Sequence, residues 1–252
     1  MKKIVLACSA LLLMLSSCSS SDSNSSSSNQ KLRQEITTDN AGNSDTQTFT
    51  YTGDKLLRVN DSDGTYYKAI YTGNLITKLE GYDDTDALID QSTFTYNSNN
   101  KLASYIYLDF EQDTAEREVF AYNSDGTISS SYYYGNSASA TPTDLVTTRT
   151  ITLLDGEVVS IVSTGDDNSS YTYTYDTKNN PYKNILGYDK IAGYADAGNR
   201  GVLRNIVTET RVTTGFTYTD NYSYTYDTSD FPLTSSISQS GMTMETVQYI
   251  YE

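Results

Sequence analysis

A short unit of the form aromatic-x-tyrosine recurs along most of the chain, and this repeat restricts the fold more than any other feature. Successive copies end 20 to 31 residues apart, except for one gap of 51 residues between Tyr175 and Tyr226. Repetition on this scale indicates an architecture built from one small supersecondary unit used many times. The clear copies are Phe49-Thr50-Tyr51, Phe94-Thr95-Tyr96, Phe120-Ala121-Tyr122, Tyr173-Thr174-Tyr175, Tyr224-Thr225-Tyr226 and Tyr249-Ile250-Tyr251, with weaker copies at Ile70-Tyr71 and Ile151-Thr152-Leu153.

The local sequence of each copy predicts a β-hairpin. Tyrosine and threonine alternate from Tyr171 to Tyr175, so in a strand the rings point to one face and the threonines to the other. Turn-forming residues follow the repeats, as in Asn97 to Asn100 and Asn123 to Gly126, and Asp63-Gly64 and Asp155-Gly156 give the same signal. Beyond the first 17 residues no stretch sustains helical periodicity. The sequence therefore predicts strands joined by tight turns.

Strand number sets the architecture. We interpret the gap of 51 residues as two periods, with a degenerate copy near Tyr194 to Ile206. About eight repeats of two strands give about 14 to 16 strands, more than a twisted open sheet usually carries without curling or splitting. We expect an all-β fold, an antiparallel meander of about eight two-stranded repeats, rolled into a barrel-like or sandwich-like sheet over residues 31–252.

Composition indicates a core built from tyrosine and a body without the usual catalytic groups. The chain has 24 Tyr and no Trp, and its aliphatic residues are so few that tyrosine must fill much of the interior, its hydroxyl reaching solvent. A net charge of −15 disfavours nucleic acid and anionic headgroups as partners. Because the chain has no His, it lacks the commonest general base and metal ligand.

The N-terminus resembles the signal peptide and lipobox of bacterial lipoproteins. Lys2 and Lys3 precede an apolar run from Ile4 to Leu15, which is too short to span a membrane. Leu15-Ser16-Ser17-Cys18 closes this run. The resemblance implies that residues 1–17 are removed and that Cys18 carries the lipid, palmitate included. Cys8 leaves with the signal peptide, so no pair of thiols remains for a disulfide.

Residues 18–30 are predicted to form a serine-rich tether. Flexible chains of this length reach roughly 20 Å, enough to hold a folded body clear of the headgroups. No later apolar segment approaches the roughly 18 residues of a membrane-spanning helix. A transmembrane barrel is also disfavoured, because the residues that alternate with the tyrosines are Thr, Ser and Asn, whereas such a barrel needs an apolar outer band. We expect a location at the outer membrane, with the periplasmic and cell-surface faces left open.

Two segments resemble the YD repeat of the RHS type. They are Tyr175-Asp176-Thr177-Lys178-Asn179-Asn180-Pro181-Tyr182 and Tyr226-Asp227-Thr228-Ser229-Asp230-Phe231-Pro232-Leu233. The string that continues through Lys183 to Tyr188 is similar to uncharacterised Bacteroidota lipoproteins with YD-like repeats. The resemblance implies antiparallel strands of a curling sheet over about residues 47 to 252. It implies no catalytic residue and no reaction.

The acidic clusters admit two interpretations. Asp61-Ser62-Asp63-Gly64, Asp83-Asp84-Thr85-Asp86 and Asp227-Thr228-Ser229-Asp230 offer oxygen ligands to calcium, but none matches a complete calcium loop. We interpret them as turn residues, and we expect no metal and no cofactor. A pair of catalytic carboxylates, as in glycosidases, remains an alternative, but spacing in the sequence does not show which two carboxylates would lie at the required separation.

Two further groups of residues are candidates for function. Tyr132, Tyr133 and Tyr134 are consecutive, so their rings cannot all face one side, and they are the best candidates for an exposed ligand platform. Asp113-Thr114-Ala115 resembles a short O-glycosylation motif of Bacteroidota envelope proteins. Thr114 is therefore a candidate for modification, in a stretch from Glu111 to Glu118 that we expect to be loop-like.

These features predict a non-catalytic lipoprotein of the cell envelope with a structural or interaction role. A glycan-binding accessory lipoprotein that uses exposed tyrosines is the first alternative, and a glycan-active enzyme is a distant second. The expected partners are the membrane, through the lipid anchor, and an envelope glycan or another envelope protein.

Overall fold

The computed structural model describes residues 29–166, 168–192 and 201–252. The predicted signal peptide, Cys18, Tyr194 and all of the tether except its last two residues lie outside these ranges. The first eight strands are β1 (Leu32–Asp39), β2 (Ser44–Thr52), β3 (Lys55–Asp61), β4 (Tyr66–Thr72), β5 (Leu75–Tyr82), β6 (Leu88–Tyr96), β7 (Leu102–Asp109) and β8 (Thr114–Tyr122). The next eight are β9 (Ile128–Gly135), β10 (Asp144–Leu154), β11 (Glu157–Gly165), β12 (Ser169–Tyr175), β13 (Ile206–Thr213), β14 (Phe216–Tyr226), β15 (Pro232–Gln239) and β16 (Met242–Tyr251). Two short 3₁₀ turns, η1 (Ser137–Ser139) and η2 (Tyr188–Lys190), complete the described elements.

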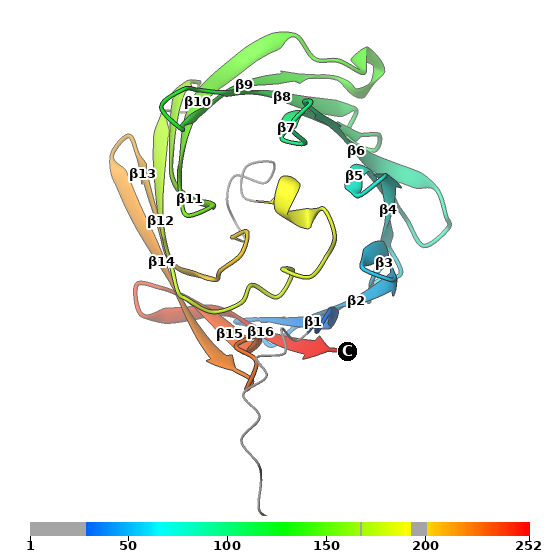
Figure 1. Cartoon of the computed structure of the whole chain (residues 1–252), viewed down its shortest axis with the longest axis vertical. Helices are drawn as coiled ribbons and strands as arrows, with labels where there is room; N and C mark the ends of the chain where they lie inside the picture. Colours follow the sequence, from blue (N-terminus) through cyan, green and yellow to red (C-terminus); the bar gives the residue numbers. More distant parts are fainter. Residues whose placement is uncertain (1–28, 167, 193–200) are drawn as a thin grey trace, which may run out of the picture.

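The strands form a closed antiparallel barrel in which each strand pairs with its neighbours in sequence. The ring closes where β1 pairs with β16, with Glu35 opposite Tyr249 and Thr37 opposite Val247. Figure 1 looks into this ring, with the blue strand β1 beside the red strand β16. Closure leaves no sheet edge exposed. The predicted all-β meander of two-stranded repeats is confirmed, and its form is a barrel.

Side-chain alternation separates the inner face of the barrel from the outer face. In β12, Tyr173 is buried in the interior, whereas its neighbours Thr172 and Thr174 are exposed on the outside. Phe94 and Phe120 likewise occupy the core, as the repeat predicted. Tyrosine, phenylalanine and single aliphatic residues from most strands therefore form the interior.

Hydroxyl groups pair across the outer face. Thr174 lies 2.6 Å from Thr208, and Thr225 lies 2.7 Å from Thr234. The same contact recurs around the ring in Thr38–Ser44, Thr95–Ser104, Thr148–Thr164, Thr210–Thr219 and Ser223–Ser236. Cross-strand pairs of this kind stabilise neighbouring strands. They also make much of the outer wall polar.

The predicted turns are present. Asn97 accepts hydrogen bonds from the backbone of Asn99 and Lys101 between β6 and β7. Asp125 caps the turn between β8 and β9 by accepting from the backbone N–H of Thr127 at 3.0 Å. Asp155 and Gly156 form the reversal between β10 and β11, both with positive φ.

The degenerate repeat predicted near Tyr194 to Ile206 is wrong. Strands β12 and β13 pair directly, with Tyr173 opposite Glu209, so no hairpin lies between them in the sheet. The gap is instead one period interrupted by an insertion. We call its described residues, 176–192 and 201–205, the plug, because they lie inside the ring in Figure 1. The plug has no alternating pattern, which is why it cannot join the wall.

Candidate ligand site in the barrel lumen

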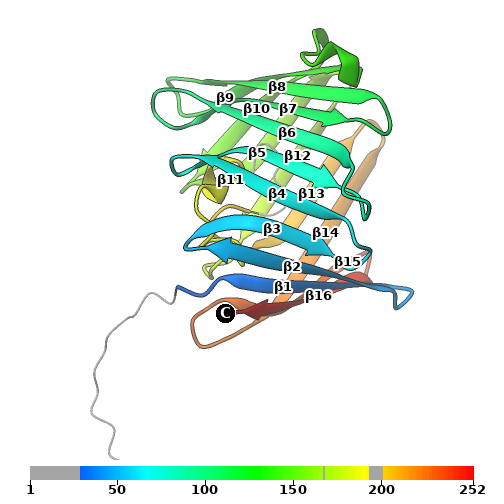
Figure 2. The same cartoon turned by 90° about the vertical axis from the view of Figure 1, so that its right-hand side faces the viewer.

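The plug is attached to the turns at one end of the barrel, which we call the plug end. Leu186 donates its backbone N–H to the carbonyl of Asp54, in the turn between β2 and β3, at 2.9 Å. Lys178 forms an ion pair of 2.6 Å with Asp230, in the turn between β14 and β15. Asn184 reaches the carbonyl of Gln30 at 2.7 Å. Figure 2 shows the yellow plug at the end where β1 begins.

A glycine allows the plug to approach the wall closely. Gly187 has φ +78°, and a Cβ at this position would lie 2.7 Å from the carbonyl oxygen of Asn74, between β4 and β5. A side chain is excluded there by both the backbone conformation and the space. The hydroxyl of Tyr71 donates to the carbonyl of Leu186 at 3.1 Å, which fixes the same contact from the wall.

Two carboxylates hold the neck of the plug. Glu157, only 1% exposed, accepts backbone N–H groups from Val202, Leu203 and Arg204 at 2.7 to 2.8 Å. Asp176 accepts from the backbone and side chain of Asn205 at 3.2 and 3.0 Å. Charge-assisted bonds of this kind are stronger than neutral ones. The two ends of the insertion are thus fixed to each other and to β11.

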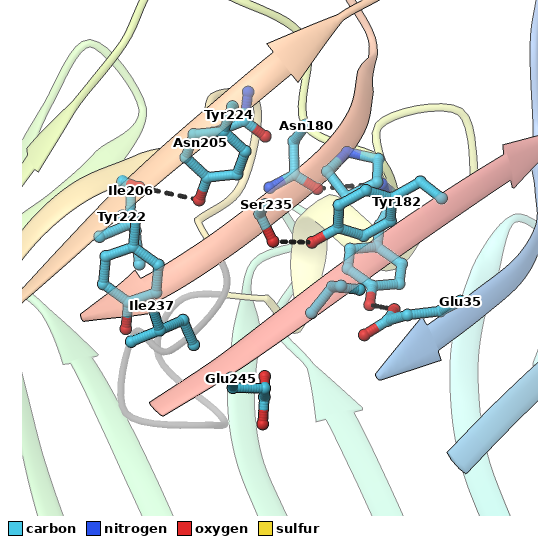
Figure 3. Close-up of a pocket in the computed structure, with 13 residues that line it drawn as sticks. Glu35, Asn180, Tyr182, Asn205, Ile206, Tyr222, Tyr224, Ser235, Ile237 and Glu245 are labelled. Carbon is cyan, nitrogen blue, oxygen red and sulfur yellow. Dashed lines mark hydrogen bonds between the residues drawn. The ribbon is translucent and has the colours of Figure 1, made fainter. Parts of the chain in front are cut away.

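Cavities lie between the plug and the wall in the described part of the chain. The first, which we call the β14 cavity, measures about 320 Å³ and lies between the plug and strands β1 and β13 to β16. Figure 3 shows Tyr222 and Tyr224 of β14 beside this space, with Glu35 and Glu245 on other strands. Glu35 accepts a hydrogen bond from Tyr182 of the plug, and Ser235 lies 3.1 Å from the hydroxyl of Tyr249. The lining mixes aromatic rings, carboxylates and hydroxyls.

The other two cavities lie on the opposite side of the plug. The β4 cavity, about 400 Å³, is lined mainly by apolar groups of β2 to β5 and by Ile185 and Tyr188 of the plug. The β7 cavity, about 350 Å³, is lined by Leu79, Ser92, Phe94, Tyr105, Tyr107, Glu116, Tyr188, Ile191 and Ala192. The two cavities share Leu79, Tyr188 and Ile191. All three volumes are in the range of small-molecule sites.

Carboxylates and tyrosine hydroxyls on the inner wall shift one another's pKa values. Burial raises the pKa of Asp90 and of Glu209, and the nearby charges of Asp109 and Asp220, respectively, raise them further. Burial and then the charges of Asp90, Asp109 and Glu116 raise the pKa of Tyr107 to about 12. These acids therefore make one another harder to ionise.

The charge of one deeply buried carboxylate of the inner wall, Glu118, is balanced by an arginine. Glu118 is 1% exposed, forms an ion pair of 2.9 Å with Arg149, and accepts a hydrogen bond from Ser130. Burial raises the pKa of Glu118, and the Arg149 charge opposes that shift. Arg149 and Arg211 are the basic residues of the inner wall in the described strands, and Arg211 lies on the other side, 5.2 Å from the ring centre of Tyr171.

The three consecutive tyrosines lie on both faces of β9. Tyr132 and Tyr134 are opposite Glu118 and Glu116 of the inner wall, and Tyr133 is opposite Arg117 on the outer wall. Arg117 lies 4.7 Å from the ring centre of Tyr133. Tyr134 is 44% exposed. The three rings thus alternate between the two faces and do not form one flat surface.

Thr114 is the first residue of β8, opposite Asp109 of β7, and is half-buried. The stretch up to Glu118 is strand from Thr114 onward, so the predicted loop is wrong beyond Asp113. The strand forms because Thr114 to Tyr122 pair with both β7 and β9. Modification of the Thr114 hydroxyl remains a prediction.

The acidic clusters serve as turns. Asp63 accepts the backbone N–H of Thr65, Asp83 that of Ala87, and Asp227 that of Phe231, each at 2.8 or 2.9 Å. Within the described residues no three His, Cys, Asp or Glu side chains gather as metal ligands. No helix in the described ranges is long and apolar enough to cross a membrane.

Sequence reasoning missed Glu157, Asp176 and the cavities. Asp176 stands in the first YD-like segment, but its partner Asn205 is 29 residues away. Glu157 looks like an ordinary residue after the Asp155-Gly156 turn. The one available signal was the long gap between Tyr175 and Tyr226, with Asn-Asn-Pro at its start.

Comparison with known proteins supports the fold and nothing finer. No protein-family model and no curated protein match the sequence. Among solved structures, the chain is similar to a porin-like protein from Bacteroides uniformis, with a TM-score of 0.51 and 14% sequence identity over 88% of this chain and 96% of that chain. The class that the fold defines is a closed, all-β antiparallel barrel.

Proposed function

We propose that the chain is a non-catalytic, lipid-anchored protein of the cell envelope whose barrel has a structural or interaction role. The observation that carries the proposal is the outer wall, where hydroxyl pairs such as Thr148–Thr164 and Thr210–Thr219 face away from the lumen. A barrel embedded in a bilayer needs an apolar band at that surface. These outer hydroxyl pairs support a barrel that is held outside the bilayer and attached to the membrane through a lipidated cysteine.

The likeness to a porin-like protein supports an envelope location, but the plug argues against an open channel. Segments that are bonded to Asp54, Gln30 and Asp230 obstruct the lumen at the plug end. The tether enters β1 at this same end, because Lys31 and Glu252 exchange backbone hydrogen bonds there. The plug end then lies toward the membrane and the opposite end away from it.

Substitution of the lipidated residue tests the anchor. Cys18→Ala is expected to abolish labelling with a palmitate analogue and to leave an uncleaved or soluble precursor, because one cysteine supplies the whole lipid anchor. Cys8→Ala, inside the predicted signal peptide, is the matched control and should label as the natural protein does. Labelling of the Cys18→Ala variant would contradict the proposal.

A glycan-binding role is the second candidate, and the β14 cavity favours it. Tyrosine rings stack on sugars, and Glu245 and Ser235 offer hydrogen-bonding groups beside Tyr222. A glycan and cell-wall binding screen on residues 29–252 tests this role. Tyr222→Ala should weaken the binding of any glycan in the β14 cavity, whereas Tyr133→Ala, on the outer wall, should leave that binding unchanged. Equal losses in both variants would place the binding elsewhere.

A further inference from the structure

The β7 cavity is amphipathic, and its polar groups form one row across three strands. Ser92 of β6 lies opposite Tyr107 of β7, and Tyr107 lies opposite Glu116 of β8. Directly opposed residues have Cβ atoms about 5 Å apart, so the three polar groups are adjacent. The rest of the lining is mainly apolar, from Leu79 and Phe94 of the wall to Ile191 and Ala192 beside η2.

These polar groups have capacity for a ligand. Among the described residues the side-chain hydroxyls of Ser92 and Tyr107 make no hydrogen bond, although both line the cavity. Glu116 accepts a long bond of 3.4 Å from the hydroxyl of Tyr105, and burial and then the charge of Glu116 raise the pKa of Tyr132. A carboxylate has about four acceptor sites, so the Glu116 carboxylate is only partly satisfied.

The charge around the cavity is uncompensated. No lysine or arginine in the described part of the chain forms an ion pair with Glu116, Asp90 or Asp109. Arg149 is committed to Glu118 at 2.9 Å, and Lys190 of η2 pairs with its neighbour Asp189 at 2.6 Å. Such a site repels anions and attracts a cation that can also donate hydrogen bonds.

We propose that the β7 cavity binds a small organic amine, with its ammonium group at Glu116 and Tyr107 and its apolar body against Leu79, Phe94 and Ile191. The ring of Tyr105 stacks on Phe94, with centroids 6.0 Å apart, and adds an aromatic wall beside the charge. Aromatic rings beside carboxylates suit ammonium ions because both attract the positive charge. This site goes beyond the proposed envelope role and is separate from the β14 cavity.

Three probes that share a phenyl ring on a two-carbon chain and differ in the charge of their end group test the proposal. Phenethylamine, phenethyl alcohol and hydrocinnamate would be titrated into residues 29–252, which contain all the strands and the β1–β16 pairing, with binding followed by calorimetry and ligand-observed NMR. The amine is expected to bind at least about 10-fold more tightly than the alcohol, since it gains a charge-assisted bond. The anionic probe is expected to bind least.

Variants then place the amine. Glu116→Gln should weaken the binding of the amine about 10-fold or more and leave the affinity for the alcohol unchanged, because the substitution removes the charge and keeps the shape of the side chain. Glu245→Gln, in the β14 cavity, is the matched control and should leave the amine unchanged. Equal affinity for amine and alcohol, or an unchanged amine affinity in folded Glu116→Gln protein, would overturn the proposal. A negative glycan screen would not affect it.

Discussion

The hydroxyl of Tyr122, at the end of β8, donates a hydrogen bond of 2.9 Å to the carbonyl oxygen of Leu102, at the start of β7. The same bond joins the end of an even-numbered strand to the start of the preceding odd-numbered strand around the plug end of the barrel. Its other members are Tyr51–Leu32, Tyr96–Ile76, Tyr175–Val158, Tyr224–Ile206 and Tyr251–Pro232. We call these bonds the tyrosine ladder. These bonds explain why tyrosines recur at regular spacing, because each bond joins the two strands of one repeat unit.

The tyrosine ladder corrects one expectation and yields a prediction. The hydroxyls of Tyr175 and Tyr224 bond to backbone carbonyls and do not simply reach solvent. We expect Tyr122→Phe to lower the free energy of unfolding by about 1 kcal/mol, since it removes one hydrogen bond and leaves a carbonyl unsatisfied. Tyr133→Phe, on the outer wall, is the control and should change it little. Denaturant melts measure both.

Truncation of a ladder tyrosine should cost much more. Tyr175 packs against the main core cluster, so Tyr175→Ala should cost about 3 to 5 kcal/mol by analogy with other large-aromatic truncations. Tyr226→Ala also removes a ring and its bond to Asp176. Unchanged melts for both alanine variants would contradict a structural role for these tyrosines, and stable variants that lost glycan binding would support a ligand platform.

The neck of the plug offers a test that leaves the barrel wall intact. Glu157→Gln replaces a carboxylate that accepts three backbone N–H groups by an amide with one acceptor and an unwanted donor. We expect faster amide hydrogen exchange at Val202 to Arg204, and a loss of stability of about 1 to 3 kcal/mol. Glu80→Gln, on the outer face, is the control. Unchanged protection at Val202 to Arg204 would show that Glu157 does not hold the plug.

Much of the wall was predictable because its rules are local. Alternation of Tyr171 to Tyr175 determines which side chains face inward, and Asn97 or Asp125 determine where the strands reverse. The six clear and two weaker copies of the repeat correspond to the eight two-stranded units, without the degenerate copy expected near Tyr194 to Ile206. Sequence left the choice between barrel and sandwich open, because closure depends on the pairing of β1 with β16, more than 200 residues apart.

The candidate site was not predictable for the same reason. The lining of the β7 cavity comes from strands β5 to β8 and from the plug. No local sequence pattern predicts that Ile191 and Leu79 line the same cavity. The row of Ser92, Tyr107 and Glu116 appears only when the strand register is known. The run from Tyr132 to Tyr134 was visible in the sequence, but strand β9 places these rings on both faces of the wall, so they do not form one platform.

Thr114 allows a direct test of modification. Intact-mass measurement on protein from its native source should show an added glycan mass that Thr114→Ala removes. The hydroxyl is half-buried at the first position of β8, next to the turn in which Asp113 accepts a hydrogen bond from Ser137 at 2.6 Å. An unmodified native mass would remove the prediction.

Metal and thiol dependence should be absent from the folding of the barrel. The carboxylates of Asp63, Asp83 and Asp227 are occupied by backbone N–H groups of their own turns. Chelator and reductant are each expected to leave the melting temperature unchanged. A rise of more than about 5 °C on addition of calcium, on the order of 1 kcal/mol or more, would instead identify one of these turns as a site.

The inner-wall carboxylates predict how stability depends on pH. Burial raises the pKa values of Asp90 and Glu209 above their ordinary 3.8 and 4.5, so the folded protein carries a desolvation cost whenever these carboxylates are ionised. As pH falls through the raised values, the folded state binds protons that the unfolded state does not yet bind. Stability should therefore increase as pH falls through these raised values, and the gain is complete below the unfolded pKa values.

The turn carboxylates act in the opposite direction at lower pH. Hydrogen bonds with Asn43 and Thr65 hold the pKa values of Asp39 and Asp63 below 3.8, so their stabilisation is lost as pH falls through those lowered values. We expect maximal stability in mildly acidic buffer, measured as the urea midpoint from pH 7 to pH 3. The double variant Asp90→Asn, Glu209→Gln should reduce the rise in stability on acidification, part of which remains because burial also raises the pKa of Glu118, whereas Asp144→Asn, at an exposed position, should not reduce it. A midpoint that falls steadily from pH 7 downward would contradict the buried position of these two carboxylates.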